Sequence, residues 1–304
     1  MDRIFFGDNQ FFAINHLSEE KARAQALRFQ ETKAVIEVID HVYDLGIKTF
    51  MCTTHDRIED ICDHIRSNPS RYAGFKIYPC MPYAHKYVNA LTELGVIGAI
   101  KKFIPGSFLV TAARGGLAIA KQDYLGLMKI LVDAEMKMFG GINTEVIFLQ
   151  NVITDLLLGL GATDCFVAFA EYVRERYGAE AGFITMNMPM LLDALEERGI
   201  ENPIICASIN KIGFRMSGGR DRYEQVIRER RFRPIAMQTL AAGAIPPAEG
   251  MEYVCGQEKI QSILFGASTR AHIEQTKELI ERMSSGNQPP AIGAPGESPP
   301  SSPL

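Results

Sequence analysis

The feature that most constrains the fold is an alternation, repeated eight times, between a short β-prone run and a longer helical stretch. The short runs are rich in β-branched and aromatic residues, which favour strands. Glycine, proline or a capping residue separates most of them from the neighbouring helices. The predicted strands are 3–7, 47–50, 75–80, 145–150, 183–187, 204–208, 234–240 and 261–265.

Helical periodicity and capping signals fill the intervals between these strands. The helices with clear limits are predicted at 18–45, 57–65, 87–101, 124–139, 164–177 and 221–231. One further helix should have Pro189 in its first turn, and the last helix should end near Met283. Strands that alternate with helices in this way belong to an α/β protein.

Eight such units in one chain predict a (β/α)8 TIM barrel that forms a single domain, residues 1–283. The rival, an open doubly wound sheet, usually carries a glycine-rich fingerprint after its first strand. Here that position reads Gly7-Asp8-Asn9-Gln10. Residues 105–121 break the alternation and are interpreted as an inserted loop between strands three and four. Residues 284–304, rich in Pro, Gly and Ser, are expected to be a disordered tail.

Composition excludes several classes of function. The net charge is −4 and the isoelectric point is near 5.9, with no basic stripe to suggest a nucleic-acid partner. No apolar run reaches the roughly 18 residues that a membrane span requires. Six irregularly spaced cysteines do not suggest a disulfide framework. We therefore expect a cytoplasmic protein that acts on a small molecule.

Polar residues follow the predicted strands, at the end of the barrel where such folds build their active sites. At least one side chain capable of specific hydrogen bonding lies at each strand end. These residues are Asp8, Asn9, Gln10, Cys52, Thr54, His55, Asp56, Cys80, Tyr83, His85, Lys86, Gln150, Asn151, Asn187, Ser208, Asn210, Lys211, Gln238, Ser268, Thr269 and Arg270.

The densest group lies after strands two and three. Cys52 and His55 are three positions apart, and Cys80, Tyr83 and His85 follow the neighbouring strand. Adjacent strands lie about 4.8 Å apart, so these side chains should line one pocket together with residues 8–10. Two thiolates and two imidazoles are also good ligands for zinc or iron, although their spacing matches no settled zinc signature.

A second candidate site follows strand eight. Residues 266–270, Gly-Ala-Ser-Thr-Arg, open a helix whose backbone N–H groups and dipole favour an anion. A phosphate site after strands seven and eight is common in this fold, although Ser268 or Thr269 acting only as a helix cap is the simpler alternative. Lys211 raises a third alternative, a Schiff-base lysine, but it lies about three residues beyond its strand.

With these segments in place, the chain resembles the aldo-keto reductases across most of its length. Residues 235–243 are similar to that family's seventh strand and pyrophosphate-contacting loop. Residues 263–270 are similar to its eighth strand and the loop that receives the 2′-phosphate of NADP. Residues 185–188 resemble the segment whose Asn holds the nicotinamide amide, and 46–50 resemble the run into the catalytic Asp.

The catalytic tetrad of that family is not matched. Met51 stands where the resemblance would place Asp, and no Tyr follows near Asp56. The position of the Lys after strand three falls near Pro79 or Cys80, and that of the His after strand four falls at Gln150 or Asn151. The resemblance therefore implies the barrel and a nucleotide-shaped or phosphate-shaped groove, with altered acid–base chemistry.

The resulting hypothesis is an oxidoreductase-like barrel enzyme that binds NADP or another phosphate-bearing ligand. The predicted catalytic residues are His55, Tyr83, His85, Asp8 and Cys52, and the predicted cofactor-binding residues are Asn187, Gln238, Ser268, Thr269 and Arg270. One alternative is a metal-dependent lyase or hydrolase with zinc or iron on Cys52, His55, Cys80 and His85. Another is a barrel that only binds and has lost catalysis.

Overall fold

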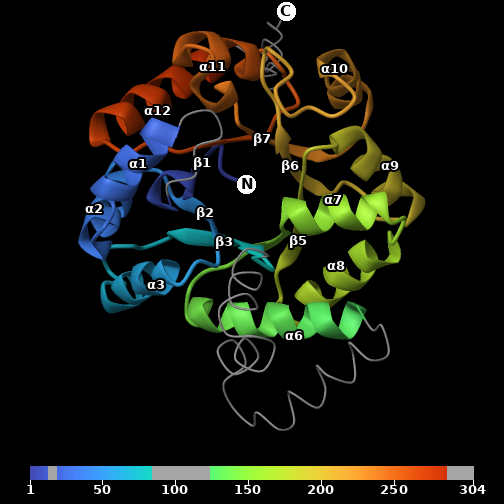
Figure 1. The fold of residues 1–304 in the computed structure, drawn as a ribbon, viewed down its shortest axis with the longest axis horizontal. Helices are drawn as coiled ribbons and strands as arrows, with labels where there is room; N and C mark the ends of the chain where they lie inside the picture. The colour runs from blue at the N-terminus through green and yellow to red at the C-terminus, as the bar shows by residue number, and fades with distance from the viewer. Residues whose placement is uncertain (13–18, 84–123, 286–304) are drawn as a thin grey trace, which may run out of the picture.

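Eight parallel strands close into a barrel in which every strand pairs with its neighbour in sequence order, and β8 pairs with β1 (Figure 1). The computed structural model describes residues 1–12, 19–83 and 124–285. The strands are β1 Ile4–Gly7, β2 Thr49–Thr53, β3 Lys76–Met81, β4 Val146–Leu149, β5 Glu180–Thr185, β6 Ile204–Ser208, β7 Arg233–Met237 and β8 Ser262–Phe265. The predicted TIM barrel is confirmed.

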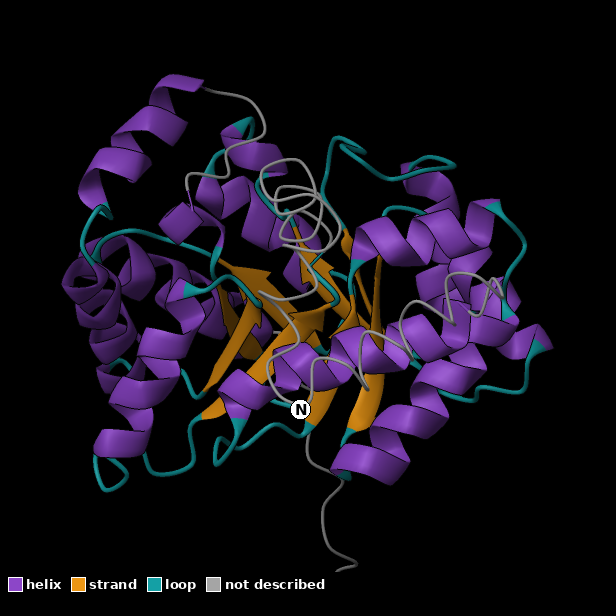
Figure 2. Ribbon diagram, turned by 60° about the horizontal axis from the view of Figure 1, so that its bottom comes forward, coloured by secondary structure: helices purple, strands orange, loops and turns teal. Residues whose placement is uncertain are grey.

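Helices surround the strands as an outer layer (Figure 2). They are α1 Glu19–Arg28, α2 Thr32–Asp44, α3 Arg57–Ser67, α6 Tyr124–Met136, α7 Asn151–Gly159, α8 Asp164–Tyr177, α9 Met188–Glu197, α10 Arg220–Glu229, α11 Pro247–Cys255 and α12 Arg270–Ser285. Short 3-10 turns are η1 Asn9–Phe12, η2 Lys137–Phe139 and η3 Ala241–Gly243. The predicted insertion and the helix at 87–101 fall within residues 84–123, outside the described part. Most of the predicted tail, residues 286–304, also lies outside it.

Several predicted boundaries are wrong, each for a local reason. The single helix predicted over 18–45 is two helices, because the chain turns at Phe29 to bury that ring 5.1 Å from Phe11. Strand seven ends at Met237 because Gln238 adopts a positive φ of 53° that no strand continues through. Strand five begins at Glu180 rather than 183, and α7 and α11 were not predicted.

Alternate strand residues face two separate apolar layers, as the period of a β-strand requires. Side chains such as Phe5, Met51 and Phe148 fill the barrel interior. Their sequence neighbours, such as Phe6 and Phe50, pack outward against the helices. The interior layer fills the barrel between the strands, so a ligand site is expected beyond it, at the carboxyl ends of the strands.

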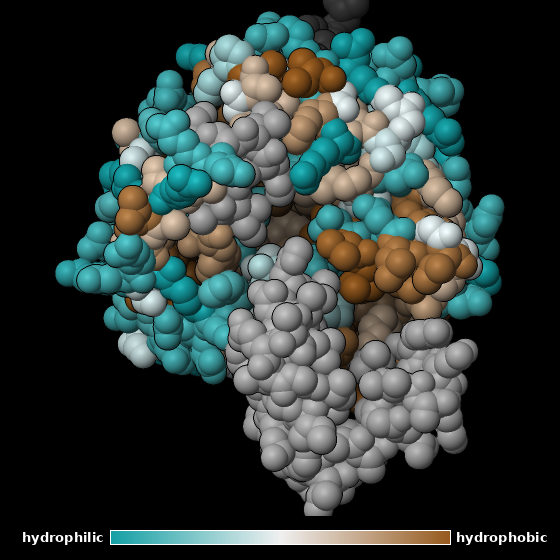
Figure 3. Space-filling model, viewed as in Figure 1, coloured by the Kyte–Doolittle hydropathy of each residue, from teal (hydrophilic) through white to brown (hydrophobic). Residues whose placement is uncertain are grey.

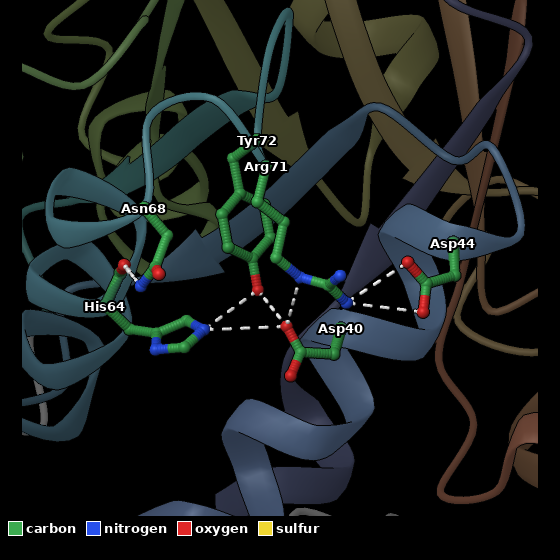
Figure 4. Close-up of polar contacts among 6 residues, drawn as sticks. All are labelled: Asp40, Asp44, His64, Asn68, Arg71 and Tyr72. Carbon is green, nitrogen blue, oxygen red and sulfur yellow. Dashed lines mark hydrogen bonds and ion pairs between the residues drawn. The ribbon is translucent and has the colours of Figure 1, made fainter.

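A polar network outside the barrel joins α2 to α3 and to the turn before β3 (Figure 4). Asp40 of α2 accepts hydrogen bonds from the Tyr72 hydroxyl and, at 3.2 Å, from Nε of Arg71. Arg71 also reaches Asp44 at 3.1 Å, and Nε2 of His64 lies 3.1 Å from the Tyr72 hydroxyl. Burial acts to raise the pKa of Asp40, but hydrogen bonds from Tyr72 and Arg71 outweigh it, so the pKa is lowered. The network therefore favours an ionised Asp40.

Candidate active site

A cavity of about 580 Å³ opens at the carboxyl ends of the strands. Its walls come from the ends of strands or the residues after them, all round the barrel. They are Gly7, Asp8, Asn9, Gln10, Gln25, Met51, Thr53, Cys80, Tyr83, Gln150, Asn151, Val152, Ile184, Met186, Arg215, Met237, Gln238, Thr239, Leu240, Ala242, Gly243, Leu264, Phe265 and Gly266. Apolar side chains gather over α7 near the centre of this face (Figure 3).

Asp8 is the buried carboxyl group of the cavity and is only 6% exposed. It follows β1, and its Oδ2 accepts both the backbone N–H and the hydroxyl of Thr53, each at 2.7 Å. Burial raises the pKa of Asp8, while the two hydrogen bonds from Thr53 lower it by less. A carboxyl group with a raised pKa in a cleft is suited to giving and taking protons.

Tyr83 lies beside this carboxyl group, in the segment that follows β3. Burial raises the pKa of its phenol, and the charge of Asp8 raises it further, so the phenol stays protonated at neutral pH. The backbone N–H of Tyr83 donates to both oxygens of Glu135, at 3.0 and 3.2 Å. Glu135, on α6, also accepts the Thr54 hydroxyl at 2.6 Å. The buried Glu135 thus holds the backbone of Tyr83 in place.

Neutral carboxamides supply most of the remaining polarity of the cavity. They are Asn9, Gln10, Gln25, Gln150, Asn151 and Gln238. The amide of Gln10 donates to the Gly7 carbonyl at 2.7 Å, and Gln238 accepts the Ser208 hydroxyl at 2.6 Å. Among the described residues, the side-chain carbonyl oxygen of Gln25 is buried and has no hydrogen-bond donor within reach. A bound molecule that carries a donor would satisfy it.

Unusual backbone conformations gather at one side of the same cavity. Five non-glycine residues in the described ranges have positive φ. Arg215, Gln238 and Ala242 line the cavity, and Ala241 lies beside Ala242; Asn202 is the exception. Such conformations cost of order 1–3 kcal/mol each and cluster at ligand sites. The loop after β7 is therefore a candidate ligand-binding segment.

The predicted pocket after strands one to three is only partly formed. Asp8, Cys80 and Tyr83 line the cavity, as do Asn9 and Gln10. Cys52 does not line the cavity, because its side chain points outward from β2 and is buried against the helix layer. The cavity lining does not include His55, whose ring stacks on Phe12 at 4.1 Å. His85 lies outside the described residues.

The predicted cofactor residues divide in the same way. Gln238 lines the cavity. Asn187 instead caps α9, with its side-chain oxygen accepting the Met190 N–H at 3.4 Å. The hydroxyl of Thr269 accepts the His272 N–H at 3.2 Å and so caps α12. Ser268 and Arg270 adjoin that helix start, within a few residues of the cavity wall at Gly266.

The proposed metal ligands do not converge in the part of the chain that the structure describes. Cys52 and Cys80 face opposite sides of the strands, one in the helix layer and one in the barrel interior. Burial raises the pKa of both thiols well above its usual range, which favours the protonated form that does not bind metal. Among described residues, no group of three His, Cys, Asp or Glu is arranged to hold an ion.

Two residues of the site were missed at the level of sequence. Glu135 carries a readable signal, because it is an acid near the carboxyl end of a mainly apolar helix, where the dipole disfavours a negative charge. Arg215 has no such sequence signal, because it lies in a loop of ordinary composition. Only its place in the cavity wall identifies it as a site residue.

Comparison with known proteins identifies the class of barrel. No protein-family model matches the sequence, and no curated protein is similar to it at a significant level. Solved structures are similar in fold. A Pseudomonas aeruginosa protein assigned to the aldo-keto reductases has a TM-score of 0.56 at 13% identity, over 93% of this chain and 91% of that one.

Two other solved structures agree with this result. An aldo/keto reductase from Brucella melitensis gives a TM-score of 0.53 at 9% identity, over 93% of each chain. An aldose reductase from Giardia lamblia gives 0.52 at 11% identity, over 93% of this chain and 91% of that one. The chain therefore has a distant aldo-keto-reductase-like TIM barrel, as the resemblance in its sequence implied. No helix in the described ranges is long and apolar enough to cross a membrane.

Proposed function

We propose that the protein is an NADP(H)-dependent oxidoreductase that interconverts a carbonyl group and an alcohol, with Asp8 and Tyr83 handling the proton. The observation that carries the proposal is the continuity of one cavity. It joins the buried Asp8 and the half-buried Tyr83, after β1 and β3, to a loop with positive φ angles after β7. A reducing enzyme needs these two elements side by side, one for the proton and one for the nucleotide.

The residues present fit a phosphate-bearing nucleotide. Gln238, oriented by Ser208, offers an amide that suits a carboxamide ring substituent. The wall at Gly266 lies so close to Gln10 that a Cβ there would displace the end of the glutamine side chain. Beyond Gly266, the N-terminus of α12 with Ser268, Thr269 and Arg270 would receive phosphate.

The chemistry assigned to the protein side chains is proton transfer. When bound, the nicotinamide supplies or accepts hydride. The phenol of Tyr83 donates its proton to the carbonyl oxygen as the alcohol forms, because a raised pKa keeps that proton on the ring until it is needed. Asp8 exchanges protons beside it, and the two hydrogen bonds from Thr53 hold the carboxyl group in one orientation. In the reverse direction the same groups accept the proton.

Titration with NADPH tests the proposal directly. The chain has no tryptophan, so the emission of the nucleotide itself reports binding without interference. We expect saturable binding that weakens in Gln238→Ala and Arg270→Ala and is unchanged in Arg228→Ala, an exposed arginine on α10. The absence of binding at millimolar NADPH would exclude the nicotinamide.

Two further variants separate catalysis from simple binding. Tyr83→Phe and Asp8→Asn should retain NADPH affinity and lose turnover of carbonyl substrates by roughly 10²-fold or more, the usual contribution of a general acid. Unchanged turnover in both would exclude Asp8 and Tyr83 as the proton-handling groups, whereas a wild type that binds NADPH without any turnover would favour the non-catalytic alternative. The metal-dependent alternative has no support from the described ligands, because Cys52 and Cys80 face away from each other.

A further inference from the structure

Arg215 occupies a distinctive place in the cavity wall. It belongs to the loop between β6 and α10, and among the described lining residues it is the one with a cationic side chain. The residue is exposed, so a ligand in the cavity can reach its guanidinium group. The other ionisable side chains of the wall, Asp8, Cys80 and Tyr83, belong to the opposite side of the strand order, at or after the ends of β1 and β3.

The loop holds this arginine in a costly conformation. Its φ is 54°, in the left-handed region that a bulky side chain rarely adopts. Asn210, fully buried, fixes the loop: its side chain donates to the Phe214 carbonyl and accepts the Phe214 N–H, both at 2.8 Å. Gly213, with a φ of 72°, completes the turn. These interactions fix the loop conformation and therefore the position of the Arg215 backbone.

Arg215 also differs from its neighbours in its partners. Lys211 pairs with Glu249 at 2.8 Å, and Arg220 with Glu224 at 3.4 Å. Within the described part of the chain, no carboxylate lies within ion-pair distance of Arg215, whose contact is the ring of Phe214 at 5.5 Å from its guanidinium carbon. The positive charge that faces the cavity is thus left for a ligand.

We propose that Arg215 binds a carboxylate or phosphate group carried by the substrate, so that the substrate is an anionic carbonyl compound or alcohol. The inference rests on the proposed function, because it takes the cavity to be the substrate site. The planar guanidinium matches either anion with two parallel hydrogen bonds. An anion at Arg215, on the β6 side, directs the rest of the molecule across the cavity toward Asp8 and Tyr83.

Thermal unfolding with inorganic phosphate or succinate, against chloride at equal ionic strength, tests this without knowledge of the substrate. Both anions should raise the melting temperature of the wild type. Arg215→Gly should weaken the binding of either anion about tenfold or more, the usual effect of losing a charge-assisted hydrogen bond. Because glycine relieves the positive φ, the unliganded variant should be as stable as the wild type or more so, which excludes misfolding as the cause.

Asn202→Gly is the matched control, since it relieves a similar φ of 50° away from the cavity and should keep the full anion response. Arg215→Lys should keep part of the anion-induced rise in melting temperature, because lysine retains the positive charge but lacks the planar guanidinium group that forms two parallel hydrogen bonds. An equal response in the wild type and Arg215→Gly would overturn the proposal.

NADPH titration of Arg215→Gly separates this proposal from the proposed function. Unchanged NADPH affinity together with a lost anion response supports a substrate-binding arginine. Weakened NADPH affinity would assign Arg215 to a cofactor phosphate instead and overturn the inference, while leaving the nicotinamide proposal standing. If the wild type binds no NADPH but Arg215 still determines the anion response, only the nicotinamide proposal fails.

Discussion

Both carboxylate oxygens of Glu135 accept the backbone N–H of Tyr83, at 3.0 and 3.2 Å, from a helix 52 residues further along the chain. Glu135 is only 2% exposed, and it also accepts the Thr54 hydroxyl at 2.6 Å. A buried carboxylate is costly unless such donors compensate it. The glutamate therefore joins the segments after β2 and β3 through one charged group.

Glu135→Ala should destabilise the protein by about 3 kcal/mol, because it removes the hydrogen bonds that the carboxyl group accepts from the Tyr83 N–H and the Thr54 hydroxyl. Glu135→Gln should cost less, since the amide oxygen can still accept. Urea unfolding measures both. In the Glu135→Ala variant, the pH dependence of turnover should also shift, because the backbone of Tyr83 would lose the acceptor that holds it beside Asp8. Exposed Glu281, in an i,i+4 pair with Lys277, is the control, and its alanine variant should change stability by about 0.5 kcal/mol or less.

The pH dependence of stability should reveal Asp8. Burial raises its pKa above the ordinary value of 3.8, against hydrogen bonds from Thr53. Above that value the folded state holds more protons than the unfolded chain, so the free energy of unfolding falls as pH rises through the folded pKa. Asp8→Asn keeps an oxygen that can accept from Thr53 and removes this fall. Its stability relative to the wild type should increase from about pH 4 toward neutrality.

Urea unfolding at several pH values checks this expectation. Asp221→Asn, at a side chain 92% exposed, should follow the wild-type pH dependence throughout. A constant difference between wild type and Asp8→Asn at every pH would show that the fold does not perturb this carboxyl group.

The barrel was predictable because its signal is periodic and repeated. Eight short apolar runs separated by helices leave few alternative folds, and an error in one boundary does not alter the others. The boundaries failed where long-range contacts decide them. The break between α1 and α2 follows from burial of Phe29 against Phe11, and no local signal specifies that contact. The early end of β7 follows from the backbone at Gln238.

The sequence predicted which strand-end residues belong to the site, but it did not predict the contacts between residues that are distant in sequence. Strand ends placed Asp8, Tyr83 and Gln238 at the cavity, because every parallel strand ends on the same face. Cys52 was predicted in the pocket but faces the helix layer, because a shift of one residue along a strand reverses the direction of the side chain. The partners Glu135 and Thr54 are far apart in sequence, so spacing alone does not bring them together.

Asp40 should show the opposite pH dependence from Asp8. Burial acts to raise its pKa, yet hydrogen bonds from Tyr72 and Arg71 lower it below 3.8 overall (Figure 4). Its contribution to stability is therefore present at neutral pH and is lost as pH falls through the folded pKa. Asp40→Asn should be less stable than the wild type at neutral pH, and the difference should shrink below about pH 4.

The matched control for Asp40 is Asp63→Asn, at a side chain 65% exposed that pairs with Arg66 on the same helix. It should cost about 0.5 kcal/mol or less at neutral pH, because an exposed i,i+3 pair is largely screened. An Asp40→Asn protein whose stability deficit grows in acid would contradict the lowered pKa.

The packing of the barrel interior should depend on Gly182. This residue of β5 lies beside Phe148 of β4, and a Cβ at Gly182 would overlap the Phe148 ring. Phe148 is fully buried among the interior side chains, so the ring has little room to move. Gly182→Ala should therefore destabilise the protein by about 1–3 kcal/mol, the usual cost of overpacking a core.

Two variants make this prediction specific. Adding Phe148→Leu to Gly182→Ala should restore part of the lost stability, because the smaller side chain leaves space for the new methyl group. Gly159→Ala is the control: no described atom lies within 4 Å of its Cβ position at the end of α7, and alanine favours the helix, so this variant should be neutral or stabilising. Urea unfolding measures all three. A Gly182→Ala protein as stable as the wild type would mean that the interior layer yields to an extra methyl group, which a close-packed barrel does not allow.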